Sequence, residues 1–221
     1  DYDKTTLLER FRNETNTALQ EGISLNPILQ SFQETVNRYK IDPSLIAQFL
    51  HSMEMDLYPI DYNSERYQEY ILGSAEVVGL MCLQVFVEGD KATFEKLKPY
   101  AMQLGSAFQK VNFLRDLKSD FSERGRVYFP GVDFENFDIS AKAIIENDIQ
   151  RDFDNAYRGI MGLPEGARKG VYLAYVYYLK LFGRIKQTAA NRIQHERIRV
   201  PDRIKFALLA KTLVQSSLNV L

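Results

Sequence analysis

The chain has 221 residues, of which 45% are hydrophobic and 26% are charged, and its formal net charge is −1. This length and composition suit one large domain with a substantial core and a soluble surface. The small net charge excludes a strong basic field for nucleic acid or an anionic membrane, and two histidines are too few for a multi-histidine metal site.

No positively charged leader followed by an apolar run opens the chain, so nothing signals export. The most apolar segments, around 77–87 and 171–182, are shorter than a bilayer span requires. The one cysteine, Cys82, lies in an apolar run and is expected to be a reduced core residue. We therefore expect a cytoplasmic protein. Such a protein could contact a membrane peripherally when it releases a hydrophobic product.

The first half of the chain predicts helices with clear start signals. Residues 4–21 carry apolar side chains at helical spacing. Residues 26–39 and 42–57 each begin with a capping side chain followed by proline at the first helical position. Two acids, Glu54 and Asp56, lie at the end of the third helix, and we expect them to be solvated.

The middle of the chain predicts the most buried helices. Residues 64–87 are apolar almost all round, which indicates a buried helix. After a turn, residues 91–98 predict a short helix, and Pro99 is expected to start or kink a long one that ends near Asp120. Small residues within 64–87 either allow close helix packing or leave space for a ligand.

The last third of the chain begins with residues 121–138, which have the composition of a structured loop. Helices are predicted over 140–161, with Ser140 as the cap, over 167–194, and from 201 to the end. No alternating strand pattern, glycine-rich phosphate loop or dinucleotide fingerprint occurs. The sequence therefore predicts an all-α domain of roughly eight or nine helices.

A polar stripe runs along the long helix, at steps of three, four and four residues. It consists of Gln109, Asn112, Asp116 and Asp120. An apolar stripe lies beside it and consists of Leu104, Ala107, Val111 and Leu114. Because Phe108, Phe113 and Leu117 also flank the polar residues, we expect the polar groups to face an internal cavity.

Asp116 and Asp120 stand one helical turn apart, a spacing at which like charges repel. A divalent cation would turn that repulsion into a site, and carboxylates without nearby His or Cys suit Mg²⁺ completed by substrate phosphates. Arg115, Arg124 and Arg126 could then donate charged hydrogen bonds to those phosphates. The alternative is a pair of surface aspartates neutralised by arginines, and spacing alone does not decide between the two.

Two longer strings are more specific. Residues 109–120 read Gln-Lys-Val-Asn-Phe-Leu-Arg-Asp-Leu-Lys-Ser-Asp, and residues 124–130 follow with Arg-Gly-Arg-Val-Tyr-Phe-Pro. Together they resemble the second aspartate-rich motif of the squalene/phytoene synthase family. The Tyr-x-x-Gly-x-Ala-x-Val-Val-Gly pattern at 70–79 is similar to the family's tyrosine-glycine-valine helix, which lines the prenyl-chain cavity. Glu76 departs from that pattern, since many members carry glycine there.

The resemblance implies the isoprenoid synthase fold, a single helical bundle around a central cavity. It implies a prenyltransferase that condenses two allylic prenyl diphosphates, farnesyl or geranylgeranyl diphosphate, head-to-head with release of diphosphate. The product would be squalene, phytoene or a shorter relative, formed by way of a cyclopropylcarbinyl diphosphate. The implied cofactor is Mg²⁺, and no nucleic-acid partner is expected.

The resemblance also implies roles for individual residues. The implied catalytic residues are Asp116, Asp120 and Tyr128, and the implied metal-binding residues are Asp116, Asp120 and Asn112. The implied substrate-binding residues are Tyr70, Gln109, Asn112, Arg115, Arg126, Tyr178 and Arg197. The implied cavity residues are Ser74 and Val78. Tyr172, Tyr175 and Tyr177 match the family position nearly as well as Tyr178, and aromatic residues at helical spacing are usually core residues. A basic residue such as Arg197 at the C-terminal end of a helix is also explained by the helix dipole alone.

The family's first aspartate-rich motif is not found. No Asp-x-x-x-Asp or Asp-Asp pair occurs in residues 1–60. We therefore expect residues 1–221 to form one domain that lacks the family's N-terminal helices. The alternative is a non-catalytic branch of the family, a lipid-binding or assembly protein on the same fold.

Overall fold

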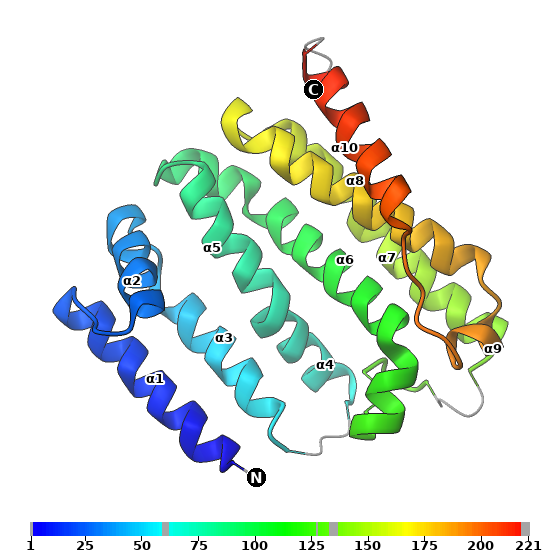
Figure 1. The fold of residues 1–221 in the computed structure, drawn as a ribbon, viewed down its shortest axis with the longest axis horizontal. Helices are drawn as coiled ribbons and strands as arrows, with labels where there is room; N and C mark the ends of the chain where they lie inside the picture. The colour runs from blue at the N-terminus through cyan, green and yellow to red at the C-terminus, as the bar shows by residue number, and fades with distance from the viewer. Residues whose placement is uncertain (1, 59–61, 127, 133–136, 218–221) are drawn as a thin grey trace.

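A computed structural model describes residues 2–58, 62–126, 128–132 and 137–217, and the side chains at 123, 124 and 213–217 lie outside that description. All regular secondary structure in these ranges is helical, as predicted (Figure 1). The elements are α1 (Lys4–Glu21), α2 (Pro27–Tyr39), α3 (Pro43–Met55), α4 (Ser64–Ile71), η1 (Leu72–Glu76), α5 (Val77–Phe86), α6 (Lys91–Arg124), α7 (Ile139–Met161), α8 (Glu165–Gln187), α9 (Ala190–Ile193) and α10 (Asp202–Ser217).

Capping side chains fix where several helices begin. Asn26 accepts hydrogen bonds from two backbone N–H groups at the start of α2, and Asp42 accepts one from Ser44 at 2.8 Å at the start of α3. Both caps confirm the sequence prediction. The prediction of Ser140 as the cap of α7 is wrong, because Asp138 accepts the N–H of Ala141 at 2.8 Å.

The central helix α6 is a continuous 34-residue element with Pro99 inside it. The predicted short helix over 91–98 is therefore part of α6. A proline within a helix costs about 3 kcal/mol, and packing of the surrounding turns, with Leu97 only 3% exposed, offsets that cost. The helix ends at Gly125, whose φ of 64° is a left-handed conformation that glycine adopts without strain.

Helix α6 also forms the centre of the bundle (Figure 1). The α4–η1–α5 segment packs on one side of it and α7 and α8 pack on the other, while α1 to α3 form an outer layer and α10 lies on α8. Ala107, Val111 and Leu114 are fully buried, at 0% exposure, so most of the predicted apolar stripe is core. Leu104 differs from them because it lines the cavity described below.

The predicted buried helix over 64–87 is one continuous helical segment, but η1 within it is a π-helix of five residues. Glycines let this segment approach α6 closely. A Cβ on Gly79 would lie 2.7 Å from the carbonyl oxygen of Ala101, and one on Gly105 would lie 2.5 Å from that of Ala75. Close packing therefore accounts for two of the small residues at this contact.

The segment Ser64–Phe86 is long and apolar enough to cross a membrane, judged by length and composition alone. The prediction that the apolar segments are too short is wrong here, because the helix begins well before residue 77. The segment packs against α3 and α6. Since the core helix of a bundle passes the same test, this property alone assigns no membrane role.

The predicted helix over 167–194 ends earlier. Helix α8 stops at Gln187, and Thr188 has extended backbone at φ −91° and ψ 131°. The short helix α9 follows as a separate turn, and residues 197–200 have no regular secondary structure. This break positions Arg197 outside any helix.

A buried ionic network joins α6 to α7. The Lys110 ammonium donates to Asp152 at 2.7 Å and also to Asp148, and the Ser106 hydroxyl donates to Asp152 at 2.8 Å. Lys110 is only 8% exposed. Burial alone would raise the pKa of Asp148, but hydrogen bonds and charge from Lys110 and Arg151 hold that pKa below its usual value.

Glu76 lies beside this network, at the end of η1. Burial raises the pKa of the Glu76 carboxyl to about 7, while Lys110 on α6 opposes that rise and Asp152 on α7 adds to it. The folded state therefore binds the Glu76 proton more tightly than the unfolded chain does. Stability contributed by this group is present at low pH and is lost as pH rises towards 7.

We expect Glu76→Gln to raise the free energy of unfolding at pH 8 relative to the parent protein, by about 1 kcal/mol after solvent screening. The gain should shrink towards pH 5, where the parent carboxyl is protonated. Urea unfolding of both proteins at the two pH values measures it. Glu95→Gln, at an exposed position on α6, is the matched control. An equal effect of Glu76→Gln at both pH values would contradict the expectation.

Candidate active site

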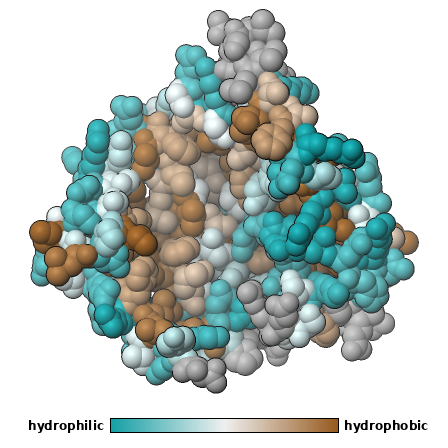
Figure 2. All heavy atoms as spheres, viewed as in Figure 1, coloured by the Kyte–Doolittle hydropathy of each residue, from teal (hydrophilic) through white to brown (hydrophobic). Residues whose placement is uncertain are grey.

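An apolar cavity of about 600 Å³ lies between α5, α6, α7 and α8. Ser74 and Val78 line one wall, and Gln109 borders the cavity from α6. Figure 2 shows this face hollowed and mainly apolar over α5 and α6, with hydrophilic surface around it. The far wall includes small residues of α8, namely Gly166, Ala167, Gly170 and Ala174. The prediction that Cys82 is a core residue is wrong, because it is exposed on the cavity wall.

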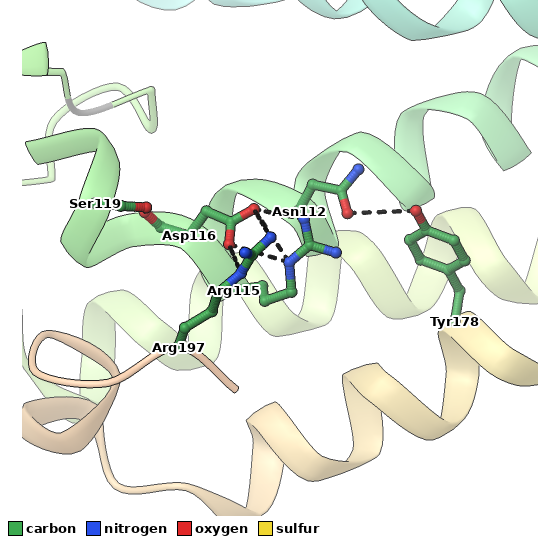
Figure 3. Close-up of polar contacts among 6 residues, drawn as sticks. All are labelled: Asn112, Arg115, Asp116, Ser119, Tyr178 and Arg197. Carbon is green, nitrogen blue, oxygen red and sulfur yellow. Dashed lines mark hydrogen bonds and ion pairs between the residues drawn. The ribbon is translucent and has the colours of Figure 1, made fainter. Parts of the chain in front are cut away.

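Asp116 binds two arginines (Figure 3). Arg115, its neighbour on α6, donates from Nε to both carboxylate oxygens at 3.1 Å and also from a terminal nitrogen. Arg197 reaches the same carboxylate from the segment after α9, with Nε 2.6 Å from Oδ1. The structure thus joins three of the predicted site residues.

Asn112 stands one turn before Asp116 and contacts α8 (Figure 3). The Tyr178 hydroxyl donates to its side-chain oxygen at 3.3 Å. The Tyr178 ring stacks on Phe108, with centroids 3.9 Å apart and the planes 15° apart. Its rival Tyr175 packs edge-on against the buried Phe153 instead. Among the tyrosines considered, the geometry therefore favours Tyr178 as the one next to the polar stripe.

A second cluster of aromatic residues surrounds Phe113, on the next turn of α6. The Tyr128 ring stacks on Phe113 with centroids 4.0 Å apart, and Tyr70 lies 5.4 Å from Tyr128. Tyr62 packs against both tyrosines. Burial raises the pKa of all of these phenols, so they are neutral hydrogen-bond donors at physiological pH. Their ring faces can attract a cation without acting as nucleophiles.

Asp56 completes the second cluster, and the sequence interpretation missed it. Its carboxylate accepts the Tyr70 hydroxyl at 3.0 Å and one Arg126 nitrogen at 2.6 Å. The expectation of a solvated helix end is right for Glu54, which is 42% exposed and pairs with Arg12, and wrong for Asp56. One signal was available: a carboxylate at the C-terminal end of α3 opposes the helix dipole and needs partners.

We expect Asp56→Asn to lower the free energy of unfolding by about 2 kcal/mol, because Arg126, whose side chain is 11% exposed, would lose its counter-charge. Glu54→Gln removes the same charge from the same helix end, and its loss should stay within about 1 kcal/mol. Denaturant unfolding of the two variants makes the comparison. Equal losses would show that Asp56 is no more than a surface acid.

Asp120 has different neighbours from Asp116. Asp120 is 8% exposed. Burial is the main cause that raises the pKa of Tyr62 and Tyr128, and the negative charge of Asp120 is a smaller cause. Across the described part of the chain, no three His, Cys, Asp or Glu side chains form a group that could hold a metal ion. The oxygen donors of Asp116, Asp120 and Asn112 nevertheless suit Mg²⁺, which takes one or two carboxylates and completes its shell with phosphate oxygens. A shared cation stays a prediction.

Of the two other predicted phosphate ligands, Arg126 does not join the Asp116 group. Arg126 is bound to Asp56, and one of its nitrogens lies 3.4 Å from the Tyr128 hydroxyl. The side chain of Arg124 lies outside the described residues, as does Val127 of the quoted motif. Within the described part, the arginines at Asp116 are Arg115 and Arg197.

An all-α bundle around an apolar cavity, with a polar stripe on its central helix that starts at Gln109 on the cavity wall, is the arrangement expected of an isoprenoid synthase fold. The model of the family described as Squalene/phytoene synthase matches residues 1–203. The chain therefore belongs to the squalene/phytoene synthase family, as the sequence resemblance predicted.

Relatives and solved structures agree with this assignment. Phytoene synthase 2 of Solanum lycopersicum is 29% identical over 179 residues, which are 73% of this chain and 57% of that protein. The 15-cis-phytoene synthase of Pantoea ananas is 26% identical over 202 residues, which are 83% of this chain and 63% of that protein. The chain spans about half the length of the phytoene synthases of Solanum lycopersicum and Zea mays.

Two solved structures share the fold. A dehydrosqualene synthase solved in complex with ligand superposes with a TM-score of 0.80 at 16% identity, covering 99% of this chain and 80% of that one. Squalene synthase HpnC of Alicyclobacillus acidocaldarius gives a TM-score of 0.71 at 20% identity, covering 85% and 75%. The isoprenoid synthase fold expected from the sequence is confirmed.

Proposed function

We propose that this protein is a prenyltransferase that joins two allylic prenyl diphosphates head-to-head and releases diphosphate. The observation that carries the proposal is the grouping of Arg115 and Arg197 around Asp116. Asp116 lies two helical turns beyond Gln109, which borders the apolar cavity, on the same face of α6. The cavity suits a prenyl chain and the arginines suit its diphosphate. Family membership and phytoene synthase relatives support the same reaction.

The residues of the site would have different tasks. Arg115 and Arg197 can donate paired hydrogen bonds to diphosphate oxygens, which neutralises the charge that develops as the C–O bond breaks. Gln109, beside the cavity, would position the substrate. Phe108, which lines the cavity and stacks on Tyr178, would present an aromatic ring to cationic carbon. Tyr128 and Phe113 are each 4% exposed, so their stack would support the site from the core. The apolar walls would exclude water, which otherwise quenches the cation.

Asp116, Asp120 and Asn112 are the residues that would hold Mg²⁺. When bound, the ion supplies Lewis-acid stabilisation of the leaving diphosphate. Asp56, at the end of α3, and Arg126, just after α6, would orient the Tyr70 and Tyr128 hydroxyls. Cytoplasmic location and membrane contact during product release belong to the proposal and await measurement.

Incubation of the intact protein with farnesyl or geranylgeranyl diphosphate and MgCl₂, followed by lipid mass spectrometry and a diphosphate assay, tests the function. We expect a hydrocarbon or alcohol of twice the substrate's chain length, with stoichiometric diphosphate. The two substrates distinguish a squalene-type from a phytoene-type product. Binding of either prenyl diphosphate without turnover would instead favour the non-catalytic lipid-binding alternative.

A further inference from the structure

The carboxylate of Asp116 is already fully engaged by arginines. Arg115 contacts both of its oxygens, and Arg197 lies 2.6 Å from one of them and 3.5 Å from the other (Figure 3). The Asp116 side chain is only 19% exposed. A divalent cation that approaches Asp116 therefore meets two guanidinium groups before it reaches the carboxylate.

We propose that Arg115 and Arg197 form a latch on Asp116 which diphosphate opens, so that a divalent cation and diphosphate bind this site in combination. The latch is defined as the contacts of these two arginines with the Asp116 carboxylate. This inference rests on the proposed function and deepens it, because it states how binding of diphosphate and binding of the cation depend on each other.

The charge balance explains why a cation alone would not open the latch. Two guanidinium charges against the carboxylates of Asp116 and Asp120 leave the group with no net negative charge to attract Mg²⁺. Diphosphate carries several negative charges, and its oxygens match the guanidinium fork at least as well as a carboxylate does. Transfer of the arginines to diphosphate frees the Asp116 oxygens at the moment when metal-binding phosphate oxygens arrive.

The surroundings of Arg197 suit a side chain that changes partners. Its side chain is 51% exposed, and residues 197–200 have no regular secondary structure. Its neighbours Ile198 and Val200 are 6% and 3% exposed, so the backbone on that side is anchored in the core. The Arg197 side chain can then change partner without movement of its backbone. Arg115, whose side chain is 21% exposed, has to turn away from Asp116 by rotation of its side chain while its backbone stays on α6.

The first test measures binding of inorganic pyrophosphate by calorimetry in EDTA, without any metal. We expect Asp116→Asn to bind pyrophosphate about 5- to 10-fold more tightly than the parent protein, because its arginines no longer have a competing carboxylate. A role for Asp116 as metal ligand alone predicts no change in EDTA. Asp154→Asn, at an exposed position of α7, is the control for loss of one negative charge.

A double-mutant cycle separates the latch from the general field of the removed charge. The gain from Asp116→Asn should largely disappear in an Arg115→Gln/Arg197→Gln background. A gain that persists there would come from the general field and would overturn the latch. Equal pyrophosphate affinity in the parent protein and Asp116→Asn would also overturn it, while leaving the proposed function standing.

The second test measures Mn²⁺ binding without diphosphate, by electron paramagnetic resonance of the free ion. We expect Arg197→Gln to bind Mn²⁺ several-fold more tightly than the parent protein, because one of the two arginines that occupy the Asp116 carboxylate is gone. Arg199→Gln, exposed two residues further along, should leave Mn²⁺ affinity unchanged. Equal gains in both variants would overturn the latch. Absence of pyrophosphate binding in every variant, with and without Mn²⁺, would overturn the proposed function itself.

Discussion

Asp116→Asn is expected to lower turnover by about 10²–10³, with the fold intact, because removal of one group that stabilises developing charge costs several kcal/mol in the transition state. Asp120→Asn should have an effect of similar size. The measurement is kcat and KM for prenyl diphosphate at saturating Mg²⁺. If the latch operates, Asp116→Asn loses kcat without losing affinity for diphosphate, so a low rate and tight product binding should occur together.

The matched control for this loss is Asp154→Asn. In the parent protein the Asp154 carboxylate accepts a hydrogen bond from Gln150 on the exposed surface of α7. The Asp154→Asn variant should turn over like the parent protein. Unchanged turnover in Asp116→Asn would exclude a role in the reaction. A surface ion-pair role would instead change stability by less than about 1 kcal/mol and leave the kinetics alone.

Lys110→Met is expected to lower the free energy of unfolding by about 3–5 kcal/mol, because it leaves the buried Asp152 without its cation. The side chains of Lys110 and Asp152 are 10% and 12% exposed, so water cannot replace the lost contact well. Urea or thermal unfolding measures the change. Lys118→Met, at an exposed position of the same helix, should stay within about 0.5 kcal/mol.

A second variant makes the Lys110 result interpretable. In Lys110→Met/Asp152→Leu the uncompensated charge is gone, and much of the lost stability should return, since replacing a buried ion pair by apolar groups is often close to neutral. A double variant as unstable as the single one would show that the loss comes from packing of the lysine stem and not from the stranded aspartate.

Much of the fold follows from local signals in the sequence. Caps such as Asn26 and Asp42 and the spacing of apolar residues on α6 act within a turn or two of their own position, so they are visible in the chain. Pro99 shows the limit of local reasoning. Its cost within α6 is local, but the packing that offsets it comes from helices that are distant in sequence.

The candidate site shows the same limit more sharply. The polar stripe on α6 could be predicted because its members lie on one helix, whereas Asp56 needed Arg126, 70 residues away, to show its role. Lys110 stood inside the recognised motif, and its burial depends on Asp148 and Asp152 on α7. The pairing of Arg197 with Asp116 spans 81 residues. These contacts depend on how helices pack, which no single stretch encodes.

The π-helical turn η1 changes the direction in which side chains point before and after it on one continuous helix. A π turn holds an extra residue compared with an α turn, so the residues before and after it are rotated relative to an unbroken α-helix. Tyr70 can therefore point to Asp56 while Val78, beyond the turn, lines the cavity wall. Loss of one residue from Leu72–Glu76 would leave a regular helix of nearly the same length but change the relative angle of these two side chains by about 100°. The same rotation would turn Gly79 away from its close contact with Ala101 on α6 if Tyr70 kept its place, so the pocket wall and the helix packing depend on the same π turn.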